Sequence, residues 1–421
     1  MMKNDINIID EKRSDAWLLI FLTWIVYATS YLGKVNYSAN IAPIIDFYGI
    51  TKAQAGTAPT FFFFAYGAGQ VVNGLLCKKY NLKWMIFFSL VISASINFIV
   101  AVTTEFAIIK WLWLVNGFIL SILWPSLIRL LSEALPQKLI GISSVVMGTT
   151  VATGTLVIYA LSSLFAAFNK FKLSFSTAAV AMFLVAFLWL FLYNKSVFNA
   201  KKEKTEDENT EKATEYMFVK NDNAHNKRTF FISVGIICFY AVGVNLIKDG
   251  LTTWVPSILK DEFSMSDSLS ILLTLFLPIL SIFGNAFALF LHKKIPEYIN
   301  HCVAVFSFMS LFIGLIIGSL KFEIVFIMLI GLIVVNFFAS SLNSLITSIF
   351  PMFMRGKVNS GLFAGVLNGF CYLGSTISSY GLGVIADNFG WTYVFWTLLS
   401  FCVMTVIVWV CFEVYKHYFE I

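Results

Sequence analysis

Charged residues are scarce in this chain of 421 residues, since Asp, Glu, Lys and Arg together make up 12% of it. Ordinary soluble domains carry about 25% charged residues, so the composition excludes a conventional water-soluble globular domain. Hydrophobic residues account for 59% of the chain, and 44 residues are phenylalanine. This composition is typical of a protein that crosses a lipid bilayer many times.

Motifs for covalent chemistry and cofactor binding are also missing from the sequence. The six cysteines are scattered without a CxxC pair, which argues against a disulfide framework or a cysteine-based metal centre. We find no phosphate-binding glycine loop followed by lysine and serine or threonine, and no nucleophile elbow. We therefore expect no cofactor, no bound metal and no enzymatic activity.

Long apolar segments are abundant. A membrane-spanning helix needs about 20 apolar residues to cross about 30 Å of hydrocarbon. Twelve segments meet this need: 16–42, 54–77, 84–103, 106–133, 140–167, 173–194, 229–257, 268–291, 299–318, 324–350, 358–386 and 391–415. The longest polar interval separates six of them from the other six. We predict an all-α membrane protein of twelve transmembrane helices in two pseudo-symmetric six-helix bundles, 1–194 and 229–421, joined by a cytoplasmic linker at 195–228.

Basic residues outside these segments are unevenly distributed. The two termini and the even-numbered connections hold 21 lysines and arginines, whereas the odd-numbered connections hold five. Positive charge collects on the cytoplasmic face of membrane proteins, so we expect a multi-pass protein of the inner (plasma) membrane with both termini in the cytoplasm. The interval from Asn194 to Arg228 carries eight basic and seven acidic residues, so we expect no nucleic-acid partner.

Two lysines interrupt apolar segments at matching positions. The segment that starts at Ala16 reaches Lys34, and the segment that starts at Thr229 reaches Lys248, after nearly the same length of chain. A charge in hydrocarbon costs at least about 2.5 kcal/mol, and transporters with paired halves bind substrate near the midplane between them. The two lysines predict an anion site shared by the two bundles. The alternative is that each lysine pairs with a neighbouring carboxylate or reaches the membrane surface.

Asp249 is the acidic residue that lies well inside a predicted helix. Adjacent residues lie about 100° apart around a helix, so we expect the Asp249 and Lys248 side chains to point in different directions. Three roles stay open for Asp249: orienting a lysine of another helix, carrying a coupling proton, or balancing charge locally.

Uncharged polar residues also interrupt the apolar segments. Interhelical hydrogen bonding is the expected role of such residues in a membrane protein, with the lining of a cavity as the alternative. The asparagines in question are Asn36, Asn73, Asn116, Asn285, Asn343 and Asn368.

Five stretches of the sequence carry a family resemblance: YLGKVNYSANIAPII at 31–45, GITKAQAGTAPTFFFFAYGAGQVVNG at 49–74, WPSLIRLLSEALP at 124–136, LIKDGLTTWVPSILKDEF at 246–263 and LNGFCYLGSTISSYGLGVIADNFGWTYVFW at 367–396. Together they resemble the organophosphate:phosphate antiporters, which are the glycerol-3-phosphate and hexose-phosphate permeases of the major facilitator superfamily. The resemblance implies the major facilitator fold and a secondary transporter that exchanges a phosphorylated metabolite for phosphate by alternating access. We expect a monomer in the lipid bilayer with a small anionic substrate.

The resemblance also implies the site residues. In the permeases two arginines on the first and seventh helices hold the substrate phosphate, and Lys34 and Lys248 fall on those positions. Lysine is a compact point charge without the planar fork of arginine, so carboxylate and sulfonate substrates stay open beside phosphates. Other positions match sites of substrate contact in the family, with helix packing as an equal alternative: Tyr27, Gln70, Thr150, Asn245 and Tyr372.

Two further functions stay open at this point. One is a proton-coupled organic anion symporter, for which Asp249 is the possible coupling residue. The other is a permease-like membrane sensor of sugar phosphate that signals to a partner. The sequence does not identify the organic part of the substrate.

Overall fold

The computed structural model describes residues 2–76, 81–208, 227–353 and 360–419, and every regular element in these ranges is helical. The first nine helices are α1 (Met2–Ala39), α2 (Ile41–Tyr48), α3 (Lys52–Leu76), α4 (Leu82–Val102), α5 (Phe106–Leu120), α6 (Leu123–Ala134), α7 (Gln137–Gly148), α8 (Thr150–Ala167) and α9 (Leu173–Glu208). The remainder are α10 (Lys227–Phe263), α11 (Asp267–Thr274), α12 (Phe276–Ser281), α13 (Gly284–Lys294), α14 (Tyr298–Lys321), α15 (Val325–Ser344), the π-helix η2 (Leu345–Ile349), α16 (Phe350–Phe353), α17 (Ser360–Phe389) and α18 (Trp391–Phe419).

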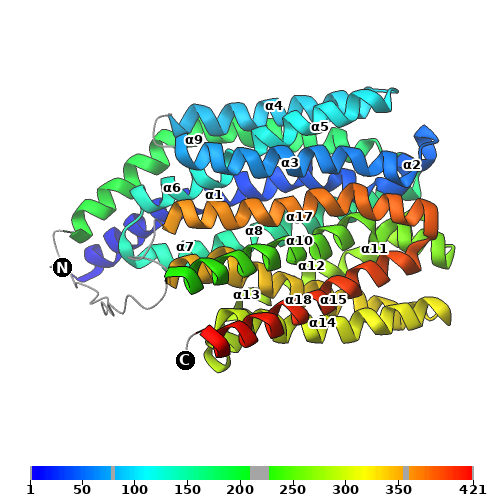
Figure 1. Cartoon of the computed structure of the whole chain (residues 1–421). Coiled ribbons are helices and arrows are strands. Elements are labelled where there is room, and N and C mark those ends of the chain that lie inside the picture. The colour runs from blue at the N-terminus through cyan, green and yellow to red at the C-terminus, as the bar shows by residue number, and fades with distance from the viewer. Residues whose placement is uncertain (1, 77–80, 209–226, 354–359, 420–421) are drawn as a thin grey trace.

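The long helices run side by side along one direction, and both termini lie at the same end of the bundle (Figure 1). Among the described residues, nine helices are long and apolar enough to cross a membrane, and ten if the bent stretch of α11 to α13 counts as one span. The expected segments 54–77 and 358–386 correspond to α3 and α17, which do not meet this apolarity criterion. α17 contains six glycines and four serines, residues that suit close helix contacts better than contact with lipid.

Proline explains where two expected segments are interrupted. Pro278 has no N–H to donate to the carbonyl of Thr274, where α11 ends, and Pro125 has none for Ser121, just after the end of α5. The chain then bends by 47° between Asp267–Ser281 and Ala286–Lys294. The segment expected at 268–291 is therefore a broken helix instead of a straight span.

The linker between the two predicted bundles begins later in the chain than predicted. α9 continues as a helix to Glu208 and α10 starts at Lys227, so 195–208 and 227–228 of the interval 195–228 are helical. Residues 209–226 lie outside the described residues. The division of the chain into bundles 1–194 and 229–421 stays a prediction.

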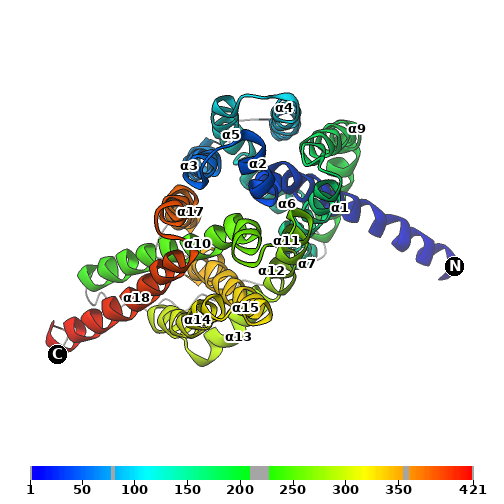
Figure 2. The same cartoon turned by 90° about the vertical axis from the view of Figure 1, so that its right-hand side faces the viewer.

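α3 and α17 make the most extensive helix–helix contact among the described residues, and α17 also packs against α10 (Figure 2). Glycine permits this close approach: a Cβ on Gly56 of α3 would overlap the backbone carbonyl of Ser379, and one on Gly374 of α17 would overlap that of Val242. A Cβ on Gly67 would lie 2.8 Å from the Cβ of Tyr372. α17 is thereby held close to both α3 and α10.

Ion pairs connect helices α1–α9 to helices α10–α18 at the end of the bundle away from the termini, where α2 lies (Figure 1). Lys52 Nζ lies 3.1 Å from the carboxylate of Asp261. Lys260 of α10 pairs with Asp46 of α2 and lies 2.8 Å from Asp267. We call these contacts of Lys52 and Lys260 the end latch.

Hydrogen bonds reinforce the same end. The backbone N–H groups of Lys52 and Ala53, which begin α3, donate to the Asp387 carboxylate of α17 at 3.0 and 2.7 Å, an arrangement that suits the positive end of a helix. The Tyr159 hydroxyl donates to the Thr252 carbonyl at 2.9 Å, and the Ser163 hydroxyl donates to the Ser268 carbonyl at 2.8 Å. This end of the bundle is therefore closed across the two groups of helices.

Replacing Lys260 with glutamine is expected to weaken closure at this end. Exposed ion pairs contribute up to about 1 kcal/mol each. A conformation in which the helices are separated at this end should therefore become severalfold more populated. In a background whose native cysteines are serine, Ser163→Cys should react severalfold faster with a membrane-impermeant maleimide once Lys260 is changed. Lys170→Gln, which removes an exposed lysine, is the matched control. An unchanged labelling rate would show that the Lys260 contacts do not hold this end closed.

Candidate functional site

Lys34 lies among aromatic side chains from three helices. Its Nζ is 4.9 Å from the ring centroid of Tyr31 in α1, 5.8 Å from Phe62 and 4.1 Å from Tyr66 in α3, and 5.4 Å from Tyr372 in α17. Within the described part of the chain, the Lys34 side chain has no ion pair and no hydrogen bond. The rings stabilise the cation through their π faces while leaving it available to an anion. We call these four side chains the aromatic cage.

Two predicted residues lie behind the cage. Tyr27 is 5% exposed and packs against Trp124 and Tyr31, with ring centroids 4.8 and 5.5 Å away. Gln70 accepts a hydrogen bond of 3.4 Å from the Asn368 amide of α17. Gln70 follows Tyr66 by one turn on α3, and Tyr27 precedes Tyr31 by one turn on α1, so each of the two lies one turn from a residue of the cage.

The backbone beside Lys34 is held by buried asparagines. The carbonyl of Gly33 accepts hydrogen bonds from Asn97 of α4 at 3.3 Å and from Asn116 of α5 at 3.0 Å. Asn36 donates to the Asn97 side chain at 2.7 Å, and all three asparagines are fully buried. These bonds anchor α1 at the peptide that precedes Lys34.

The expectation of interhelical hydrogen bonds is confirmed for five of the six asparagines singled out, which bond to the partners Asn97, Ser121, Gly33, Asn245 and Gln70. The side chain of Asn285 lies outside the described residues. Asn97 was not singled out, although it occupies the same kind of apolar surrounding.

Lys248 has an acidic partner on its own helix. Its Nζ lies 3.3 Å from Oδ1 of Asp249, so the expectation that the two side chains point in different directions is wrong. Long side chains can curl around the helix surface, and a low-dielectric surrounding rewards pairing of opposite charges. The alternative of a neighbouring carboxylate therefore holds for Lys248, whereas Lys34 lacks such a partner among the described residues.

Asp249 is held by polar side chains of α17 and of its own helix, α10. Its Oδ2 accepts a hydrogen bond of 2.5 Å from the Ser375 hydroxyl of α17 and one of 3.3 Å from Asn245, one turn earlier on α10. Asn245 in turn accepts from Asn343 of α15 at 2.6 Å. Lys248, Asp249, Asn245, Ser375 and Asn343 form a network that we call the Asp249 network.

The aromatic cage and the Asp249 network are electrostatically coupled. Lys34 lies within reach of the charges on both Asp249 and Lys248, and Asp249 acts on it more strongly. The carboxylate of Asp249 also acts on Tyr31 and Tyr372. Tyr372, whose ring lies beside Lys34, and Ser375, which is bonded to Asp249, are three residues apart on α17, so the cage and the network are neighbours.

Thr150 does not join this group. Its side chain is fully buried, and its hydroxyl donates to the Met147 carbonyl at 2.5 Å on the preceding turn. The neighbouring Thr149 hydroxyl instead accepts a hydrogen bond of 2.9 Å from the Trp24 indole of α1. Packing of α7 and α8 against α1 accounts for these two residues.

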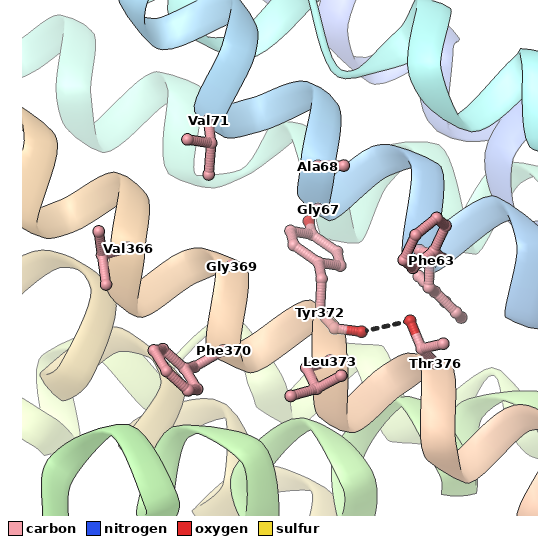
Figure 3. Close-up of a pocket in the computed structure, with 11 residues that line it drawn as sticks. Phe63, Gly67, Ala68, Val71, Val366, Gly369, Phe370, Tyr372, Leu373 and Thr376 are labelled. Carbon is pink, nitrogen blue, oxygen red and sulfur yellow. Dashed lines mark hydrogen bonds between the residues drawn. The ribbon is translucent and has the colours of Figure 1, made fainter. Parts of the chain in front are cut away.

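Tyr372, one of the four cage residues, also lines a surface cavity. This cavity, of about 390 Å³, lies between α3 and α17 and is lined mostly by apolar side chains, among them Phe63, Phe370 and Leu373 (Figure 3). Besides Tyr372, Thr376 is the one residue drawn in Figure 3 that has a side-chain hydroxyl. This hydroxyl donates to the Tyr372 carbonyl at 2.7 Å. An apolar lining is unsuited to an anion, so this cavity is not a candidate anion site.

Four residues of the site were missed from the sequence: Tyr31, Phe62, Tyr66 and Ser375. Helical spacing contained a usable signal, because residues three or four apart share a helix face. Tyr31 precedes Lys34 by three residues, Tyr66 precedes Gln70 by four, and Ser375 follows Tyr372 by three.

An all-helical bundle whose apolar helices carry the half-buried cations Lys34 and Lys248 is typical of a multi-pass membrane transport protein. The family model of the Major Facilitator Superfamily matches residues 23–364, and this chain belongs to that superfamily of transporters. It is a secondary transporter and not an enzyme. The predicted fold class is thereby confirmed.

Two known transporters and one solved structure are similar to this chain along most of its length. The chain is 22% identical over 395 residues to the sugar phosphate exchanger 3 of Homo sapiens, covering 84% of this chain and 78% of the relative. It is 21% identical over 436 residues to the glycerol-3-phosphate transporter of Bacillus subtilis (strain 168), covering 95% and 94%. Among solved structures, a bacterial homologue of the human lysosomal transporter Spinster, inward-facing and occupied, matches with a TM-score of 0.73 at 12% identity, covering 95% of this chain and 97% of that one.

Proposed function

We propose that this transporter carries a small organic anion, a phosphorylated metabolite, in exchange for phosphate. The observation that carries the proposal is Lys34, an intramembrane cation in an aromatic cage without an acidic partner among the described residues. A buried charge of this kind is costly unless an anion or water reaches it. The relatives named for sugar phosphate and glycerol-3-phosphate support phosphate as the group that binds.

Alternating access is the transport mechanism that we propose. The end latch and the Asp387 hydrogen bonds close the end away from the termini. With both termini in the cytoplasm, as the distribution of lysine and arginine predicts, this conformation corresponds to one closed to the outside. Lys34, Lys248 and the side chains of Tyr27, Gln70, Asn245 and Tyr372 form the proposed substrate site, whereas Thr150 supports it by packing.

Reconstitution tests the proposal directly. Purified protein in liposomes loaded with inorganic phosphate should take up labelled glycerol 3-phosphate or glucose 6-phosphate, and uptake should fall to background without internal phosphate. Uptake that needs only an imposed pH difference would establish the proton-coupled symporter instead. Binding without uptake under either gradient would favour the sensor, and neither binding nor uptake of any phosphate, carboxylate or sulfonate would refute an organic anion substrate.

A further inference from the structure

The two cations of the site have unequal surroundings. Lys34 is stabilised by four aromatic rings and lacks an acidic partner within the described residues. Lys248 is paired with Asp249 at 3.3 Å, and the two side chains are 28% and 15% exposed. A pair of positive charges that is symmetric in the sequence is therefore asymmetric in the structure.

The carboxylate of Asp249 is surrounded by polar side chains. Both of its oxygens are occupied, Oδ1 by the Lys248 ammonium and Oδ2 by the Ser375 hydroxyl and the Asn245 amide. The Lys248 ammonium and the Asn245 amide nitrogen can only donate, and a carboxylate accepts from both. Besides Lys248, the titratable groups whose charges couple to Asp249 are Lys34 and Tyr31 of α1 with Cys371 and Tyr372 of α17. Of these four, only Lys34 is charged in its ordinary form near neutral pH.

The formal charges of the site then sum to one positive charge, from Lys34, Lys248 and Asp249. Charges interact strongly at short range in a low-dielectric interior, and a net charge enclosed within the membrane is costly. An anion with one negative charge leaves the closed site neutral. An anion with two leaves a negative charge uncompensated beside Asp249.

We propose that Asp249 sets the valence of the anion, so that the site accepts the singly charged form of a phosphate, sulfonate or carboxylate in preference to a doubly charged one. This inference rests on the proposed anion site. It assigns Asp249 a role in specificity that differs from carrying a coupling proton, because it operates with the carboxylate ionised throughout.

Two pairs of probes with matched chemistry test the inference. At pH 7.5, methyl phosphate is mostly doubly charged, since the second pKa of a phosphate monoester is about 6, whereas dimethyl phosphate carries a single charge. Sulfate and methanesulfonate form a second pair, doubly and singly charged. Binding is measured by titration calorimetry on purified full-length protein at this one pH, so that groups of the protein are compared in the same state.

The parent protein should bind the singly charged member of each pair more tightly. Asp249→Asn raises the charge of the site to two positive charges, so the ratio of affinities should shift by about tenfold or more toward the doubly charged member. Asp249→Glu should keep the parental preference. Glu105→Gln, which removes an exposed carboxylate outside the site, is the matched control and should change nothing. Asp249→Ser replaces the asparagine variant if that variant does not fold.

Three outcomes separate this inference from the proposed function. Binding of both members with a ratio that Asp249→Asn leaves unchanged would overturn the valence role while keeping the anion site. Tighter parental binding of the doubly charged members would do the same. Failure of all four probes, inorganic phosphate and glycerol 3-phosphate to bind the parent would refute the anion site and the inference together.

Discussion

Lys34→Gln is expected to reduce anion affinity by roughly 10-fold to 150-fold, which corresponds to the 1.5 to 3 kcal/mol typical of hydrogen bonds to charged groups. The physical reason is that the remaining charges, Lys248 and Asp249, form a pair of zero net charge. Transport should fall further than binding, because closure around an anion loses the cation that the anion neutralises. The measurements are calorimetric affinity for phosphate and exchange in phosphate-loaded liposomes.

Two comparisons make this test specific. Lys110→Gln is the matched control, because Lys110 is another lysine within an expected segment but lies 5.8 Å from the ring centroid of Trp111 on α5, outside the site. Lys248→Gln should also impair binding, since it leaves Asp249 to repel the anion. The double change Lys248→Gln with Asp249→Asn should recover part of the affinity by restoring one net positive charge. Parental exchange by correctly folded Lys34→Gln would refute the role of Lys34.

Gly56→Leu is expected to lower the melting temperature by several degrees and to abolish transport. A Cβ at this position would overlap the Ser379 carbonyl, so a leucine forces α3 away from α17. Overpacking of this kind costs typically about 1 to 3 kcal/mol. Because α3 and α17 supply three of the four cage rings, their separation also displaces the rings around Lys34.

Gly318→Leu is the control for this substitution, because a Cβ at Gly318 meets no atom within 4 Å beyond its chain neighbours and the nearby backbone of its own helix. Its melting temperature and transport should match those of the parent. Melting is followed in detergent by intrinsic fluorescence and transport in liposomes. A Gly56→Leu protein as stable and as active as Gly318→Leu would mean that the close contact of α3 with α17 is not needed for the fold or for the site.

Local patterns were sufficient for the fold class and for the two lysines. Long apolar runs determine where helices span a bilayer, because an unsatisfied backbone in hydrocarbon is penalised. Lys34 and Lys248 stand out because charge is costly in such runs. The lower apolarity of α3 and α17, which sets them apart from the nine apolar spans among the described residues, is also visible in the sequence. It appears as glycine, threonine, glutamine and asparagine in α3 and as glycine and serine in α17.

The surroundings of these residues were decided by the tertiary structure. Lys34 meets rings from α3 and α17, which are separate helices far from it along the chain, and Asp249 meets Ser375 of α17. The sequence by itself determined which segments are helical, that most of them can cross a membrane, and where the two cations lie along them. Each of these properties depends on the residues within a single segment. Only the packing of helices decided that Lys34 is free of an acidic partner among the described residues while Lys248 is paired. Packing also decided that the Thr150 hydroxyl bonds the Met147 carbonyl at the end of α7. Such contacts depend on which faces of two helices pack together. Glycines such as Gly56 and Gly374, which lie against the backbone of a neighbouring helix, allow these faces to pack closely.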